Sequence, residues 1–176
     1  MMKKTLFALT LLLLFALNCL AQQDCQRHRE TEGRFSICVP EGWTVKESAD
    51  DKFKMIYAPQ SGVFTSNINF KEETSAAPLG DYVAAGIKEL KSNTEKIGAT
   101  SIKVISQSDF TTASNLRGIQ VVFSTEYKGI QFRQLQYLFD AGGNRKLVVT
   151  CTGLEKDQQQ LDPVFDRAAK SFQLDR

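Results

Sequence analysis

Apolar and polar residues alternate along much of the chain, which is the pattern of half-buried β-strands. The first alternating run holds Phe35, Ile37 and Val39, and it stops at Pro40-Glu41-Gly42, after which Trp43 starts a returning strand. Proline at the second position and glycine at the fourth position favour a type I turn over residues 39–42. The pattern therefore predicts an opening hairpin with Trp43 packed into the core at its base.

Further strand-like runs follow, and two segments have a helical period instead, one between these runs and one after them. The strand-like runs are 53–57, 64–70, 102–108, 116–127, 130–140 and 146–152. Within 130–140 the apolar phase shifts between Phe132 and Leu135. Either this strand contains a bulge, or its two ends are covered on different faces.

The first helical segment carries an apolar stripe and the second begins with a clear start signal. The stripe consists of Leu79, Val83, Ile87, Leu90 and Ile97. Gly98 is suited to end that helix. Asp162 is the expected N-cap of the second helix and Pro163 its first residue. The order strands, helix, strands, helix predicts an α+β fold, in which helices pack on one mostly antiparallel sheet.

The first 21 residues have the organisation of a secretory signal peptide. Lys3 and Lys4 precede a short apolar run, and Cys19-Leu20-Ala21 places small residues before a cleavage site. The run of about a dozen residues is shorter than the roughly 20 that a spanning helix needs. We expect a periplasmic or secreted protein with no transmembrane segment after processing. The alternative is an envelope lipoprotein with a lipid anchor at Cys19, although the residues before Cys19 fit that pattern poorly.

Removal of this segment changes the charge balance. The whole chain has 176 residues, with 22 Lys and Arg and 20 Asp and Glu; the first 21 residues hold two of the lysines and no acidic residue, so 20 of each sign remain. A neutral chain has little means of releasing counterions from phosphates, which argues against nucleic-acid binding. Residues 22–33 are polar without periodicity and are expected to form a mobile leader. Residues 34–174 then form a single domain.

Three cysteines remain after processing, in a compartment that permits disulfides. Cys25 and Cys38 are the closest in sequence and are the favoured pair. A bond between Cys25 and Cys151 is the alternative. In the favoured case Cys151 is a buried small apolar side chain.

The run from Gly33 to Trp43 resembles the opening of the PsbP-like family, and the ending Ser171-Phe172-Gln173-Leu174 resembles that family's C-terminal helix region. The residues that carry the opening motif are Phe35, Pro40, Gly42 and Trp43. The resemblance implies an α/β/α sandwich around a twisted, mostly antiparallel sheet. It also implies a non-catalytic binding or assembly role. Photosynthetic members are linked with calcium and manganese through histidines and carboxylates, but this domain has no histidine, so no metal ligand or cofactor site is carried over.

The residues themselves offer little catalytic chemistry. His28 is the only histidine and lies in the expected leader, where we expect it to be solvated. Nucleophilic triads and histidine-containing zinc sites both need a positioned imidazole. The carboxylate pairs Asp50-Asp51 and Glu72-Glu73 are expected to be solvated as well. We therefore predict no catalytic residue, no metal site and no cofactor.

These observations favour an exported, non-catalytic binding or assembly module of the bacterial cell envelope, whose partner is an unknown envelope protein. A carrier of a small apolar ligand is the alternative, followed by a carboxylate-based enzyme. The expected partner surface lies in the loops 47–52 and 140–145. Its candidate residues are Asp50, Asp51, Asp140 and Arg145. Charge reversal there is expected to weaken partner capture while the fold stays intact.

Overall fold

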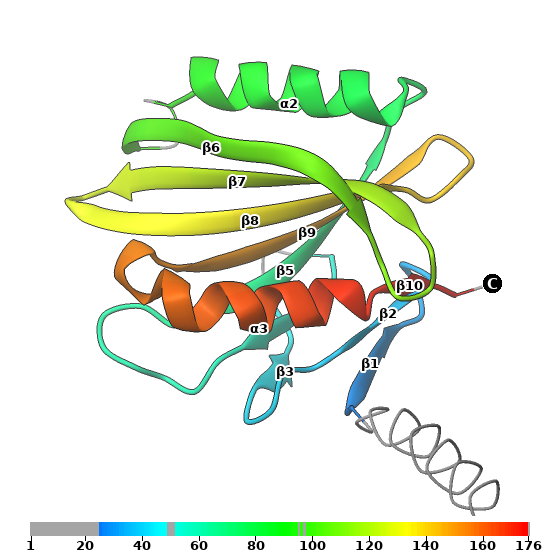
Figure 1. Cartoon of the computed structure of the whole chain (residues 1–176), viewed down its shortest axis with the longest axis horizontal. Helices are drawn as coiled ribbons and strands as arrows, with labels where there is room; N and C mark the ends of the chain where they lie inside the picture. Colours follow the sequence, from blue (N-terminus) through cyan, green and yellow to red (C-terminus); the bar gives the residue numbers. More distant parts are fainter. Residues whose placement is uncertain (1–24, 49–51, 95, 97, 176) are drawn as a thin grey trace, which may run out of the picture.

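A computed structural model describes residues 25–48, 52–94, 96 and 98–175 (Figure 1). The expected signal segment 1–21, which contains Cys19, lies outside this part, and so do Asp50, Asp51 and Ile97. The expectations for these residues stay predictions. Among the described residues, no helix is long and apolar enough to span a membrane.

The strands of the described part form two antiparallel sheets. The small sheet has the order β1-β2-β10 and the large sheet the order β3-β4-β5-β9-β8-β7-β6. The strands of the small sheet are β1 (Arg27–Glu30), β2 (Phe35–Cys38) and β10 (Gln173–Leu174). Those of the large sheet are β3 (Thr44–Lys46), β4 (Met55–Tyr57), β5 (Asn67–Thr74), β6 (Ala99–Thr111), β7 (Arg117–Tyr127), β8 (Ile130–Asp140) and β9 (Arg145–Leu154).

Two helices cover opposite faces of the large sheet (Figure 1). Helix α2 (Leu79–Ser92) packs on one face through Val83, and helix α3 (Gln158–Lys170) packs on the other through Phe165. Because strand side chains alternate, neighbours such as Val148 and Val149 lie on opposite faces and belong to different halves of the core. The expected α/β/α arrangement is confirmed.

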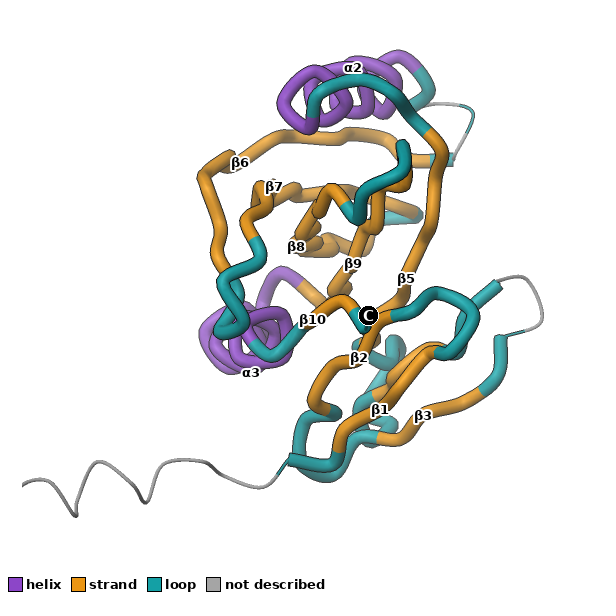
Figure 2. Tube along the Cα trace, turned by 90° about the vertical axis from the view of Figure 1, so that its right-hand side faces the viewer, coloured by secondary structure: helices purple, strands orange, loops and turns teal. Residues whose placement is uncertain are grey.

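The larger half of the core lies between the large sheet, α3 and the small sheet. Its fully buried aromatic side chains are Phe35, Phe53, Tyr137, Phe139, Phe165 and Phe172. The Phe139 and Phe172 rings stack with centroids 4.9 Å apart. The small sheet is therefore held by α3 and by the C-terminal strand, and Figure 2 shows it at the end of the molecule opposite α2.

The opening hairpin predicted from sequence does not form. Strand β2 pairs with β1 and β10, whereas β3 pairs with β4, so the two strands belong to different sheets. The turn between them lies one residue later than expected: the Trp43 N–H donates to the Pro40 carbonyl at 3.0 Å, and Gly42 at its third position has φ +76°. A positive φ at that position is what a type II turn requires of glycine.

The segment expected to be a mobile leader contains a strand. Residues 27–30 form β1, with Arg27 opposite Cys38 and Glu30 opposite Phe35. Cys25 and Cys38 form a disulfide with Cα atoms 5.5 Å apart, which is the pairing their separation favoured, and Cys151 is free and buried. An edge strand held by backbone hydrogen bonds and a disulfide needs no apolar periodicity, so the sequence pattern did not reveal it.

Both helix ends that the sequence predicted are displaced. Helix α2 ends at Ser92, where the Asn93 N–H donates to the Glu89 carbonyl, and Gly98 (φ +73°) instead leads into β6. Helix α3 begins at Gln158, after a 3₁₀ turn at Glu155–Asp157, so Pro163 lies inside it. Asp162 also lies inside the helix and is therefore not an N-cap. Its carboxylate accepts hydrogen bonds from Arg133 of β8 instead.

Strand β8 has no bulge. It pairs with β7 and β9 in unbroken register, and the register shifts of the sheet lie between β6 and β7 instead. Leu135 belongs to the α3 side of the core, whereas Phe132 contacts Phe64 on the other face with ring centroids 4.9 Å apart. The second of the two alternatives is therefore correct: the ends of β8 are covered on different faces.

Candidate functional site

Asp140, a candidate partner-surface residue, is held by internal hydrogen bonds. Its Oδ1 accepts the Gly142 backbone N–H at 2.9 Å and its Oδ2 accepts Lys146 Nζ at 2.9 Å. The Gly142 hydrogen bond and then the Lys146 contact hold the pKa of Asp140 below its ordinary value. The Lys146 side chain is only 3% exposed, so Asp140 serves first to neutralise a buried ammonium group.

Arg145, the other described candidate, joins the two sheets. Its Nη2 donates to Glu72 Oε2 of β5 and to the Gly33 carbonyl beside β2, each at 2.8 Å. The hydrogen bond from Arg145 lowers the pKa of Glu72. A charge reversal at Arg145 would leave both acceptors without their donor, so we now expect it to destabilise the fold rather than to leave it intact.

The Glu72-Glu73 pair does not form a carboxylate centre. The two side chains lie on opposite faces of β5, where Glu72 contacts Arg145 and Glu73 contacts Tyr82 of α2. Within the described ranges, no group of three or more His, Cys, Asp and Glu residues is placed to hold a metal ion.

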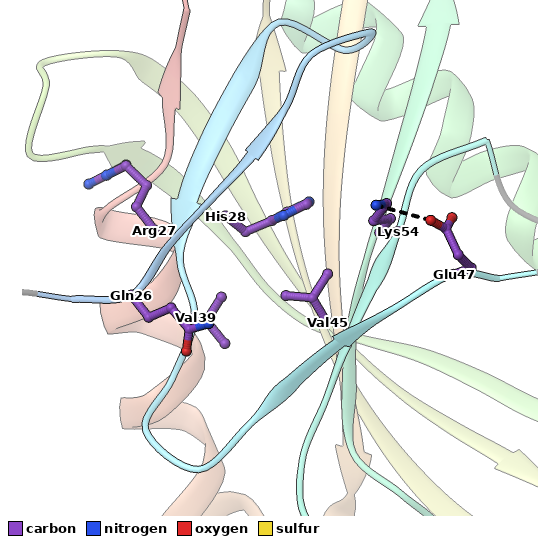
Figure 3. Close-up of a pocket in the computed structure, with 7 residues that line it drawn as sticks. All are labelled: Gln26, Arg27, His28, Val39, Val45, Glu47 and Lys54. Atoms are coloured by element: carbon purple, nitrogen blue, oxygen red, sulfur yellow. Dashed lines mark ion pairs between the residues drawn. The ribbon is translucent and has the colours of Figure 1, made fainter.

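A cleft of about 380 Å³ lies between β1, the end of β2 and β3 (Figure 3). Its lining residues are Gln26, Arg27, His28, Val39, Val45, Glu47 and Lys54. The His28 ring points toward it, whereas Arg27 points away (Figure 3) and donates to the Ser171 carbonyl at 3.1 Å. Lys54 and Glu47 form an ion pair at 3.0 Å across the cleft wall.

His28 is not solvated as expected, because its side chain is only 12% exposed. Burial lowers its pKa below 6.5, and the Glu30 carboxylate, 3.7 Å from Nε2, opposes this shift. The imidazole is therefore mainly neutral at pH 7. A neutral ring therefore lies between the two sheets. Among the described residues that line the cleft there is no serine, threonine or cysteine that the ring could activate.

A larger groove, of about 580 Å³, lies between α2 and the part of the sheet that α2 leaves uncovered. The sheet supplies its apolar floor and α2 its apolar wall. The floor residues Val121, Phe123, Leu138 and Val148 are buried with Val83 of α2 in the core, whereas Ile87 and Leu90 of α2 are half-buried. Beyond this floor the groove continues over β5 and β9, where Asn69 and Thr150 line it. The volume lies in the range of pockets that hold small molecules.

A row of uncharged polar side chains crosses the groove. Thr150 of β9 is directly opposite Asn69 of β5 on one side and Gln136 of β8 on the other, so all three lie on one face. Among the described residues, none of the three side chains has a hydrogen-bond partner. Thr150 is only 9% exposed. These groups are consequently available to a molecule that enters the groove.

The side chains of the neighbouring row on the same face are hydrogen-bonded to the protein. In this row Thr152 of β9 lies opposite Asn67 of β5 on one side and Gln134 of β8 on the other. Asn67 Nδ2 donates to the Thr65 carbonyl at 3.2 Å, and Gln134 Nε2 donates to Thr152 Oγ1 at 3.5 Å. The free hydrogen-bonding capacity is therefore concentrated in the row that lines the groove.

The charges on the β5 side of the groove neutralise one another. Glu73 accepts Tyr82 Oη at 2.6 Å and pairs with Lys71 Nζ at 2.5 Å. The Lys71 contact and then the Tyr82 hydrogen bond lower the pKa of Glu73, and burial raises the pKa of Tyr82. The β5 side therefore presents little net charge, and Glu89 on the α2 side adds a carboxylate to the lining.

Gly86 forms part of the helical wall of the groove. A Cβ added there would meet nothing within 4 Å, so no close internal contact requires glycine. Glycine in the interior of a helix costs about 0.5–1 kcal/mol relative to alanine. The helix therefore has a weak helix former at an exposed position that borders the groove and leaves open space there.

The groove was not predicted from the sequence, although part of its signal is visible there. The polar members of the alternating runs include Asn69, Gln136 and Thr150, and amides and hydroxyls are unusual choices for the covered face of a central strand. Only the pairing registers bring the three together, because they come from positions up to 81 residues apart in the chain.

The comparisons with known proteins identify the fold. The sequence matches no family model and no curated protein sequence. The structure is similar to cyanobacterial PsbP (CyanoP) from Synechocystis, with a TM-score of 0.66, 13% identity, and coverage of 88% of this chain and 95% of that one.

Two other solved structures are similar over nearly their whole length. LpqN of Mycobacterium tuberculosis, described as involved in cell envelope biogenesis, has a TM-score of 0.61 and 13% identity, and covers 89% of this chain and 88% of its own. The Ran-binding protein Mog1p of Saccharomyces cerevisiae has a TM-score of 0.58 and 10% identity, with coverage of 86% and 95%. The fold of the chain is therefore PsbP-like, as its opening and closing motifs suggested.

Proposed function

We propose that this chain is an exported, non-catalytic binding module of the cell envelope and that the groove beneath α2 is its binding site. The observation that carries the proposal is the unpartnered row Asn69–Thr150–Gln136 on the groove floor. Amide and hydroxyl side chains hold a ligand by hydrogen bonds but do not exchange protons near neutral pH. Such a lining is suited to retention rather than turnover.

Three observations support the extracytoplasmic location. The N-terminal 21 residues have the pattern of a signal peptide. The Cys25–Cys38 disulfide fits an oxidising compartment. A protein of the same fold, LpqN, is described as acting in cell envelope biogenesis.

A photo-crosslinking experiment in the native envelope tests the proposal. A benzophenone side chain at Ala85, which lines the groove, is expected to give an adduct, whereas one at Lys156, exposed beside α3, is expected to give none. An adduct of either a small molecule or a protein at Ala85 supports a binding module. Equal labelling at both positions, or none at Ala85, contradicts it.

The non-catalytic part has its own test. A broad hydrolase and transferase screen of the purified protein is expected to find no turnover. Turnover that disappears on substitution of one acidic residue would establish the carboxylate-based enzyme instead. Intact mass of the exported protein decides its N-terminus: a chain beginning at Gln22 is expected, and an acylated Cys19 would identify a lipoprotein.

A further inference from the structure

We infer that the groove beneath α2 binds a small uncharged amphiphile, with its apolar part against the half-buried Ile87 and Leu90 and an amide or hydroxyl group on the Asn69–Thr150–Gln136 row. The inference rests on the proposed function and gives the class of ligand for that site. Its basis is the order of the lining: apolar beside α2, polar and uncharged at the Asn69–Thr150–Gln136 row, and charged among the described residues at Lys71, Glu73 and Glu89.

The polar row matches a group that both donates and accepts hydrogen bonds. Asn69 and Gln136 each offer a carbonyl oxygen and an NH₂ group, and Thr150 offers a hydroxyl. An amide or an alcohol can satisfy donors and acceptors of this kind together. A carboxylate only accepts and an ammonium only donates, so each would leave part of the row unsatisfied.

Charge selects most strongly against anionic ligands. The cation nearest the row along β5, Lys71, is 2.5 Å from Glu73, and Glu73 also accepts the Tyr82 hydroxyl. A carboxylate entering the groove would find Lys71 already paired, and Glu89 of α2, which also lines the groove, would repel it. An ammonium group could approach Glu89, but it cannot accept hydrogen bonds from the amide groups of Asn69 and Gln136.

The helical wall admits such a ligand because of Gly86. This position is open: apart from its chain neighbours and the nearby backbone of α2, no atom lies within 4 Å of the point that a Cβ would occupy. Because Gly86 lines the groove, a larger side chain there is expected to fill part of it. Gly86 is consequently the position at which the groove can be closed without disturbing the core.

Three probes with one chain length separate the possibilities: octanamide, octanoate and octylammonium, titrated into the purified protein and followed by backbone amide chemical shifts. Octanamide is expected to shift groove residues and to bind at least tenfold more tightly than either ion. Gln136→Leu is expected to reduce that preference to less than threefold. Gly86→Leu is expected to weaken octanamide at least tenfold, and Ala84→Leu, on an exposed position of the same helix, is expected to leave it unchanged.

Shifts that map away from the groove, equal affinity for the three probes, or full octanamide binding by Gly86→Leu would overturn the inference. Unfolding curves of each variant show whether a loss reflects the fold. A protein cross-linked at Ala85, together with no octanamide binding, would refute the ligand class while the binding module stands. Absence of both would refute the proposed function itself.

Discussion

The Arg133 guanidinium of β8 forms a bidentate ion pair with the Asp162 carboxylate of α3. Arg133 Nε lies 3.1 Å from Asp162 Oδ1 and 2.9 Å from Oδ2, and Arg133 Nη2 lies 2.9 Å from Oδ2. A fork of this kind fixes the direction of the helix as well as its distance from the sheet. It explains why Asp162, which looks like a helix cap in the sequence, is a helix-to-sheet contact.

Asp162→Asn is expected to lower the free energy of unfolding by about 1–3 kcal/mol, because the largely buried Arg133 guanidinium loses the charged acceptor of its hydrogen bonds. Asp157→Asn makes the same change at the position before α3, where the side chain makes no capping hydrogen bond. It is expected to change stability by less than about 0.5 kcal/mol. Urea unfolding of both variants tests this, and equal losses would show that the Arg133 contact is not special.

Trp43 is half-buried rather than fully buried, and its ring meets the Phe165 ring edge-on with centroids 5.9 Å apart. Trp43→Ala is expected to cost about 2–3 kcal/mol, which is below the roughly 3–5 kcal/mol of a fully buried aromatic side chain. Val63→Ala is the control, because Val63 is 81% exposed. An unchanged melting temperature for Trp43→Ala would remove its packing role between the sheets and α3.

The disulfide encloses a short segment, since Cys25 and Cys38 have a sequence separation of 13. Replacing both cysteines by serine is expected to cost about 2–3 kcal/mol. Because β1 is an edge strand whose backbone pairs with β2 alone, amide hydrogens of residues 27–30 are expected to exchange faster in the variant. The contacts of Arg27 with the Ser171 carbonyl and of Arg29 with Asp175 remain in the variant. Cys151→Ala leaves the disulfide in place and should keep the protection of β1; loss of that protection in Cys151→Ala would contradict the assignment.

His28 is expected to make stability depend on pH near neutrality. Burial lowers its pKa in the folded chain from the ordinary value of 6.5, with Glu30 and Lys54 as the charged groups around it. As the pH falls below 6.5, the unfolded chain takes up the proton before the folded chain does, so stability is lost. It is fully present above that pH.

Urea unfolding at pH 7.5 and pH 5.5 measures this effect in the parent protein and in His28→Gln. The parent is expected to lose more stability on acidification than the variant does. The carboxylates with lowered pKa, such as Glu72 and Asp140, are common to both proteins and titrate at lower pH. Identical losses in the two proteins would show that His28 does not titrate differently on folding.

Gly86→Ala is expected to stabilise the protein by about 0.5–1 kcal/mol, because the helix gains propensity and the new methyl group meets no atom. Gly118→Ala is the opposite case, since a Cβ there would lie 2.6 Å from the Leu138 carbonyl oxygen. It is expected to destabilise. Thermal unfolding of the two variants checks the contrast, and a destabilised Gly86→Ala would mean that the helix wall is closer packed than the structure shows.

The sequence by itself determined the classes of structure. Alternation with a period of two predicted strands over 53–57 and 64–70, and the stripe through Leu79 and Val83 predicted α2. Such patterns are local, because the spacing of side chains along one strand or helix decides which of them share a face. The α+β class, the PsbP-like resemblance and the favoured Cys25–Cys38 pairing came from the same local information.

The tertiary structure alone decided how these elements combine. Strands β2 and β3 belong to different sheets, the polar segment at Arg27 pairs as an edge strand, and Asp162 binds Arg133. Each of these contacts depends on a partner that is distant in the chain. The tertiary structure also assembled the candidate site: Asn69, Gln136 and Thr150 are ordinary polar positions in the sequence, and strand register makes them a row. Register is a property of paired strands, so no single strand could have shown it.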